Sequence, residues 1–219
     1  MTSSFFVRRN DQAILAPHPY RQRRFTGGHA AMVTTPDSQV PTLWQTTPLP
    51  HGWQWARPHS GRDARAAGRL VSRNMRAYWK ARGMRFSLPV FLKHWPTQQS
   101  LLWRPRHRVH GLLSWTCHKE HAHLCEFQLD EGYRGQGMGT ALLAQWLLEC
   151  YRQGVRSVEL RVFRDNPAYH LYSRFGFWAL AVDTDIPGFM TMRCRLDRRQ
   201  CAHIEQLAHQ GQMPLSLSA

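Results

Sequence analysis

The sequence has no long hydrophobic run, and its acidic residues and cysteines are few. Its apolar stretches, such as Ala141–Ala144 and Leu147–Leu148, span only a few residues, whereas a membrane helix needs about 20. The segment Phe5–Val7 is too brief for a secretory signal, and arginines follow it rather than precede it. We therefore expect a cytoplasmic protein with no membrane partner.

The charge balance is strongly basic, with 14 acidic residues against 29 lysines and arginines and a formal net charge of +15. This excess favours anionic partners such as phosphorylated cofactors or nucleic acid, although biased codon usage explains an arginine-rich surface equally well. Because the basic residues are spread along the chain, nucleic acid stays open as a partner but is not favoured. The five cysteines form no C-x-x-C pair, which argues against a disulfide framework.

Three regions differ in composition. Residues 1–50 carry scattered prolines among Thr, Ser and Gln without a persistent period, so we expect a disordered or irregular extension in which Met32 is an alternative start. Residues 51–197 contain the strand and helix patterns of one domain. Residues 198–219 are expected to form a polar tail.

Hydrophobic periodicity within the central region predicts strands near 53–55, 101–103, 109–117, 123–129, 157–163, 177–182 and 189–196. Helices are predicted over 63–82, 87–95, 140–153 and 166–175. The order β-α-α-β-β-β-α-β-α-β-β predicts a single α/β (α+β) domain.

A glycine-rich turn joins the strand 123–129 to the helix that follows it. Gly135, Gly137 and Gly139 let backbone N–H groups point at a ligand, and the helix start adds its positive dipole end. Arg134 adds a charge suited to phosphate. A Walker loop is absent, and the Rossmann pattern would need glycine where Thr140 stands. The turn fits a pyrophosphate, with a tight strand-to-helix connection as the alternative.

The pattern Arg134-x-x-Gly137-x-Gly139 resembles the pyrophosphate signature of GNAT superfamily N-acetyltransferases, and Asn166–Phe177 resembles a second helix motif of that family. The resemblance implies a mixed, mostly antiparallel sheet flanked by helices. It implies transfer of an acetyl group from acetyl-CoA to an amine, with no metal. It implies that the pyrophosphate lies on the turn 134–140, whose contributing residues are Arg134, Gly135, Gln136, Gly137, Met138, Gly139 and Thr140.

The resemblance also implies roles for four further residues. Phe127 and Leu129 would pair with the pantetheine arm, and a backbone N–H near Leu129 would polarise the acetyl carbonyl. Asn166 would contact the same arm. Tyr172 would protonate the departing thiolate, although its place on the apolar stripe of its helix fits a plain core residue as well.

A general base is expected on the strand before the glycine turn. A period of two places His123, Cys125, Phe127 and Leu129 on one face and Glu126 on the other. His123 is the first candidate because histidine titrates near neutrality, and Glu126 is the second. A histidine on the surface of a hairpin is an equally good interpretation of His123.

Several alternatives stay open. The histidines around 118–123 and Cys125 have mixed spacing, which favours a solvated turn over a metal site. Asp183 and Asp185 lie in a turn that borders the acceptor site in the family, and ordinary turn roles explain them as well. A basic nucleic-acid- or ribosome-binding module and a non-catalytic acyl-CoA sensor are the rival functions. The acceptor, a small amino-acid-like amine or a peptide or protein amine, is not fixed, and neither is a homodimer.

Overall fold

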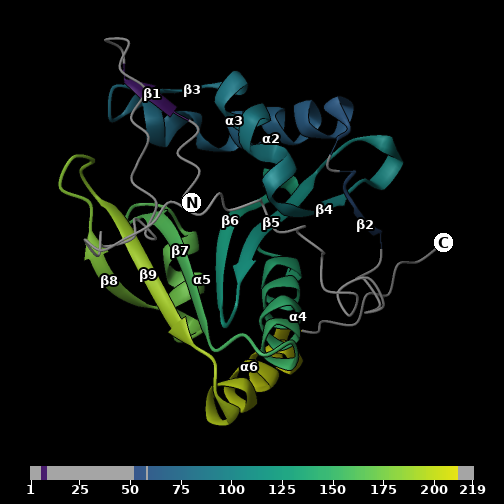
Figure 1. Ribbon diagram of the computed structural model, residues 1–219, viewed down its shortest axis with the longest axis vertical. Helices are drawn as coiled ribbons and strands as arrows, with labels where there is room; N and C mark the ends of the chain where they lie inside the picture. Colours follow the sequence, from purple (N-terminus) through teal and green to yellow (C-terminus); the bar gives the residue numbers. More distant parts are fainter. Residues whose placement is uncertain (1–5, 9–51, 58, 212–219) are drawn as a thin grey trace, which may run out of the picture.

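The computed structural model describes residues 6–8, 52–57 and 59–211. In these ranges a seven-stranded sheet lies between helices on both faces (Figure 1). The strand order is β2-β4-β5-β6-β7-β9-β8. The strands are β2 (Trp53–Trp55), β4 (Gln99–Trp103), β5 (Gly111–His118), β6 (His121–Leu129), β7 (Ser157–Phe163), β9 (Phe189–Arg195) and β8 (Trp178–Val182).

Neighbouring strands in this sheet run antiparallel, with the exception of β6 and β7, which run parallel. The mixed, mostly antiparallel sheet flanked by helices is therefore confirmed. The parallel pair arises because the helix α4 (Met138–Arg152) carries the chain from the end of β6 back to the start of β7. A crossover of this kind is the usual way to join parallel strands.

One face of the sheet is covered by α2 (Gly61–Lys80) and α3 (Leu88–His94). Ser60 caps α2, since its hydroxyl accepts a hydrogen bond from the Asp63 N–H at 3.2 Å. The buried stripe of α2 consists of Ala64, Ala67, Gly68, Leu70 and Val71. It packs into one of two hydrophobic clusters together with sheet residues such as Leu102 and Leu112.

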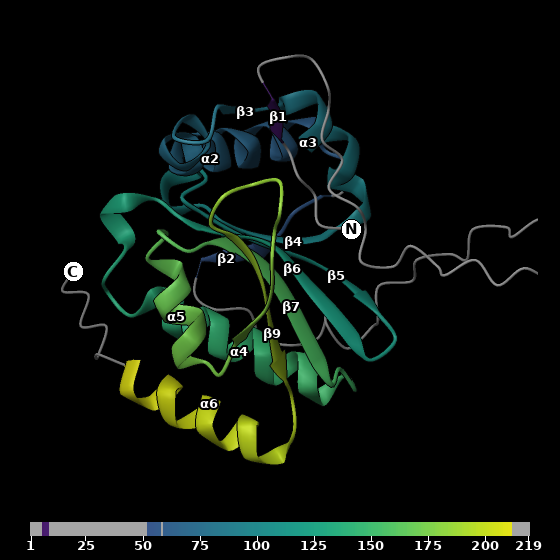
Figure 2. The same ribbon diagram turned by 90° about the vertical axis from the view of Figure 1, so that its left-hand side faces the viewer.

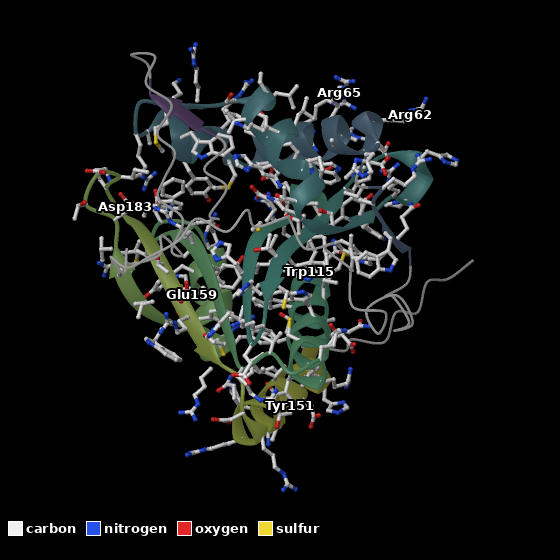
Figure 3. All side chains as sticks on the ribbon, viewed as in Figure 1. Arg62, Arg65, Trp115, Tyr151, Glu159 and Asp183 are labelled. Carbon is white, nitrogen blue, oxygen red and sulfur yellow. The ribbon has the colours of Figure 1, made fainter. Side chains whose placement is uncertain are left out.

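The opposite face is covered by α4 and α5 (Ala168–Arg174), and α6 (Arg198–Gly211) lies against α4 on the side away from the sheet (Figure 2). The apolar stripe of α4 includes Leu143 and Leu147, both fully buried. Trp115 of β5 lies at the centre of this second cluster (Figure 3). The sheet thus separates two cores, and both depend on strands that reach the candidate site.

The polar tail predicted from residue 198 is wrong for residues 198–211, which form α6. Cys201 and Ile204, at 6% and 0% exposure, pack this helix onto the domain. Most residues of this segment are polar, so its apolar face was not recognised in the sequence. A few apolar residues about one turn apart are enough to bury one face of a surface helix.

The predicted irregular extension, residues 1–50, lies outside the described residues except at β1 (Phe6–Arg8). This strand pairs antiparallel with β3 (Met84–Phe86), with Phe6 opposite Phe86. Neither of these three-residue strands was predicted, although β2, which has the same length, was. Three short 3-10 turns complete the described elements: η1 (Trp95–Thr97), η2 (Pro105–His107) and η3 (Glu131–Tyr133).

Candidate active site

The strands β6 and β7 part in the middle of the sheet. They pair only over His121–Leu124 and Ser157–Leu160. Beyond these residues β6 continues along β5, and β7 continues along β9. An unpaired edge of β6 therefore faces an unpaired edge of β7 from Cys125 onward, on the side where β6 leads into the glycine turn.

The backbone of β6 presents hydrogen-bonding groups to this opening. The Asp130 N–H donates to the His110 carbonyl at 2.8 Å, on the β5 side. Because successive residues of a strand direct their backbone groups to opposite sides, the N–H and C=O groups of Phe127 and Leu129 point toward the opening. These are the two residues predicted to pair with an extended ligand arm.

A bulge in β6 changes which side chains share a face. Leu124 lies opposite Trp115 and Glu126 lies opposite Ser114, so Cys125 is an extra residue in β6. Leu124 before the bulge and Leu129 after it therefore point into the same core. The period-two prediction that grouped His123 with Leu129 is wrong, because the bulge shifts the alternation by one residue. His123 and Glu126 share the face toward α2.

Glu126 lies where β6 has left β7, and it belongs to a short polar chain. Gln128 donates from Nε2 to Glu126 Oε2 at 2.9 Å, and Asn74 of α2 donates from Nδ2 to Gln128 Oε1 at 3.1 Å. Burial raises the pKa of Glu126 to about 7, while the Gln128 hydrogen bond acts in the opposite direction. A carboxyl group with this pKa can accept a proton near neutrality.

Tyr172 of α5 packs at the other side of the opening. Its ring lies 6.5 Å from that of Phe127 and 5.7 Å from that of Phe177, measured between centroids. Burial and then the negative charge of Glu126 raise the pKa of Tyr172 above its usual value. The hydroxyl therefore stays protonated at neutral pH and is available as a proton donor.

His123 and Cys125 have environments that suit catalysis less well. His123 lies opposite Thr116 on β5 and Glu159 on β7, in the half of β6 that is paired on both sides. Burial, with a contribution from Glu126, raises the pKa of the Cys125 thiol to about 12. A thiol with this pKa is a poor nucleophile, since the thiolate is the reactive form.

The glycine turn ends in an uncapped helix start. Gly135 and Gly137 have φ values of +73° and +79°, a region that glycine enters without steric cost. Gly137 is the N-cap of α4, without a side-chain cap hydrogen bond, and its carbonyl accepts from the Ala141 N–H at 3.0 Å. The N–H groups of residues 138–140 precede that first bond and have no acceptor within the helix. The turn therefore forms an anion site next to Leu129.

Side chains brace the junction between β6 and this turn. The Leu129 carbonyl accepts from Arg134 Nε at 2.9 Å and from Asn74 Nδ2 at 3.0 Å. Asp130 pairs with Arg73 of α2, and its other oxygen lies 2.7 Å from His110 Nδ1. Arg134, predicted to contact phosphate, thus directs at least its Nε to the backbone of β6.

Asn166 and Asp183 engage in local contacts. The Asn166 side-chain oxygen accepts from the Ala168 N–H at 3.0 Å, at the start of α5. Asp183, the first residue of the β8–β9 connection (labelled in Figure 3), pairs with Arg161 and accepts from the backbone N–H of Asp185 at 3.0 Å. These contacts match the turn interpretation of Asp183, whereas a role for Asn166 toward a ligand stays a prediction.

Two residues near the opening, Asn74 and Gln128, carry no sequence motif that predicts them. Asn74 lies on a helix distant in sequence, so no local pattern could connect it to β6. Gln128 stands two residues after Glu126 on one strand, and that spacing was the signal available.

Comparison with known proteins agrees with this geometry. Residues 101–179, from β4 into β8, match the family model for the acetyltransferase (GNAT) domain. The match spans the opening between β6 and β7 and the glycine turn, so this region resembles a GNAT acetyltransferase domain. A domain of this kind implies acyl transfer from acyl-CoA.

Solved GNAT structures share the fold of this chain at low sequence identity. Ard1 from Thermoplasma volcanium is 22% identical, with 67% of this chain and 99% of that chain covered and a TM-score of 0.52. The ribosomal-protein-S18-alanine N-acetyltransferase from Escherichia coli is 19% identical, with coverages of 66% and 94% and a TM-score of 0.52. PaiA N-acetyltransferase from Thermoplasma acidophilum, solved with coenzyme A, is 15% identical, with coverages of 66% and 99% and a TM-score of 0.50. No curated protein matches the chain in sequence.

Two further observations concern metals and membranes. Within residues 6–8, 52–57 and 59–211, no three or more His, Cys, Asp or Glu side chains are grouped so that they could hold a metal ion. Over the same described ranges, no helix combines the length and apolarity that a membrane crossing requires.

Proposed function

We propose that this protein moves an acetyl group from acetyl-CoA to a primary amine by direct transfer. The observation that carries the proposal is the opening between β6 and β7, which has Glu126 and Tyr172 at its sides and the uncapped start of α4 at its end. A long thioester cofactor could place its pyrophosphate at the start of α4 and its thioester in the opening. Tyr172 and Glu126 would then lie near the thioester and the incoming amine.

In this proposal the turn binds one end of the cofactor. The N–H groups of residues 136–140 hold the pyrophosphate at the positive end of α4. The open backbone edge at Phe127 and Leu129 pairs with the pantetheine arm, as an added strand would. The free N–H of Leu129 then lies where it can polarise the acetyl carbonyl. Asn166 and Arg134 flank this path.

The transfer step needs two proton movements. The amine nitrogen attacks the thioester carbon, a C–N bond forms, and the C–S bond breaks. Glu126 takes the proton that the amine loses, and the Tyr172 hydroxyl gives its proton to the departing thiolate. His123 was the first candidate for the base, but Glu126 is favoured because it lies in the opened part of β6.

The acceptor is proposed to be a small amino-acid-like amine or a peptide or protein amine. With a net charge of +15, the protein would repel polycationic acceptors over long distances. Two of the described carboxylates near the opening are also paired with arginines: Asp130 with Arg73, and Asp183 with Arg161. A singly charged or neutral amine meets less repulsion.

The test is acetyl-CoA consumption, measured by release of the free CoA thiol against a panel of amines. We expect turnover with at least one amine of the proposed classes. Tyr172→Phe should lower kcat by about 100-fold, at the low end of the range for general acid catalysis, while acetyl-CoA affinity is unchanged. Tyr169→Phe removes a hydroxyl from the same helix and should leave kcat unchanged.

Two results would count against the proposal. Binding of acetyl-CoA without turnover on any amine would favour a sensor. An equal loss of kcat in both tyrosine variants would show that the Tyr172 hydroxyl has no special role.

A further inference from the structure

Six basic residues form a continuous row along the exposed side of α2. They follow one another at intervals of three or four residues, which places them on one face of an α-helix. All six are exposed, whereas the opposite face of α2 is buried against the sheet. We call this set the α2 basic row; its members are Arg62, Arg65, Arg69, Arg73, Arg76 and Lys80.

Little within the described structure neutralises this row. Asp63, the acidic residue of α2, is 3% exposed, and it accepts from the Arg57 N–H at 3.0 Å and from Arg104 at 2.8 Å. Among ion pairs between described residues, the row contributes only Arg73, which pairs with Asp130. The positive ends of Arg62 and Arg65 point away from the body of the molecule (Figure 3).

Helix stability does not account for such a row. Like charges three or four residues apart on one helix repel each other and destabilise it. The α2 basic row contains five successive pairs of this kind. A solvated face that served stability alone would alternate charge signs, so the arrangement is explained best by a partner of opposite charge.

We propose that the α2 basic row binds the phosphodiester backbone of a nucleic acid. From Arg62 to Lys80 the row extends about 27 Å, with a charge at roughly each 5.4 Å turn. A regular polyanion matches this regular spacing better than the uneven carboxylates of an acidic protein. Five of the six members are arginines, whose planar forks bind phosphate oxygens in pairs. Contacts to phosphates carry no sequence information directly, so we expect binding that does not depend on base sequence.

The row also lies next to the candidate active site. Arg73, a member of the row, pairs with Asp130 at the end of β6, and the adjacent Asn74 contacts the Leu129 carbonyl and Gln128. A nucleic acid bound along α2 would thus pass close to the opening between β6 and β7. This inference goes beyond the proposed acetyl transfer and does not depend on it.

The test is the affinity of the full chain for a labelled 20-nucleotide oligouridylate, measured by fluorescence anisotropy from 50 to 200 mM NaCl. The variant Arg62→Gln/Arg65→Gln/Arg69→Gln removes three charges from the row. The matched control is Arg195→Gln/Arg198→Gln/Arg199→Gln, which removes three exposed charges from the end of β9 and the start of α6. Thermal unfolding establishes that both variants are folded.

We expect the row variant to lose about tenfold or more in affinity at 100 mM NaCl. The slope of log K against log salt should flatten by about 2, because each phosphate contact to a single strand contributes about −0.7. The control should retain the slope of the natural protein. Equal losses in both triple variants would overturn the proposal, as would competition by polyglutamate that equals competition by unlabelled RNA at the same charge concentration.

Discussion

Glu126 carries the pH dependence that the proposed mechanism predicts. Burial raises its pKa to about 7, so the carboxyl is largely protonated at pH 6 and largely ionised at pH 8. Only the ionised form accepts the proton of the amine. For an acceptor used at constant ionisation state, kcat should rise with pH through about 7 and then level. Initial rates between pH 5.5 and 9 measure this limb.

Three variants test which residue causes the rise of kcat with pH; this rise is called the limb below. Glu126→Gln should abolish it and lower kcat by about 10²- to 10⁴-fold. Gln128→Leu removes the amide donor that lowers the pKa of Glu126, so the limb should move to higher pH. His123→Gln should leave it in place. Loss of the limb in His123→Gln, with the limb kept in Glu126→Gln, would reverse the assignment.

Some residues near the opening could be predicted from the sequence, and others could not. The resemblance located Tyr172 and the glycines because their motifs are local. The faces of β6 were assigned incorrectly, because one extra residue, Cys125, inverts the alternation and no local signal marks a bulge. Asn74 comes to Leu129 and Gln128 only through the packing of α2 on the sheet.

At the scale of elements, the proposed cofactor binding depends on the start of α4. Gly137→Ala places a Cβ at a φ of +79°, which strains the backbone by about 1–2 kcal/mol and crowds the anion site. We expect acetyl-CoA affinity, measured by calorimetry, to fall by about tenfold or more, because the added methyl group stands where the pyrophosphate would approach the backbone N–H groups; a tenfold loss corresponds to about 1.4 kcal/mol.

Gly154→Ala is the matched control for this change. Gly154 follows the opposite end of α4 with a φ of +86°, and an added Cβ would meet nothing within 4 Å. Both variants should lose similar stability, but only Gly137→Ala should lose affinity. A parallel loss of affinity in both would indicate a general effect of strain on the helix.

The helix α6 is predicted to be part of the stable domain. Ile204 is fully buried against α4 and its neighbours. Ile204→Ala should lower the free energy of unfolding by about 2–5 kcal/mol, measured by urea denaturation. Leu207→Ala, at a partly buried position of the same helix, should cost less. A change below about 0.5 kcal/mol for Ile204→Ala would mean that α6 is docked only loosely.

Most elements of the sheet and its helices could be predicted in order, because nearly all of them, with the exception of β2, have hydrophobic periods that extend over five or more residues. The strand predicted over 157–163 agrees with β7 at both ends. The exceptions are short or mostly polar: β1 and β3 have three residues each, and α6 hides its apolar contacts among charged side chains. Periodicity requires repetition, which these segments do not provide.

At the scale of the whole molecule, charges that are dispersed in the sequence come together in the fold. The spread of arginines argued against nucleic acid, yet a spacing of three or four residues is the spacing that aligns side chains on a helix. The parting of β6 from β7 is likewise a property of the assembled sheet. Hydrophobic periodicity predicts where the strands are. It does not predict over which residues two neighbouring strands pair.

The central claim is that acetyl-CoA binds along the open edge of β6 with its pyrophosphate at the start of α4. Hydrogen–deuterium exchange with and without acetyl-CoA tests this location most directly. The account predicts slower exchange in peptides covering residues 125–141 and 166–172, with no change in α6. Binding that left both regions unprotected, or no binding at millimolar acetyl-CoA, would contradict it.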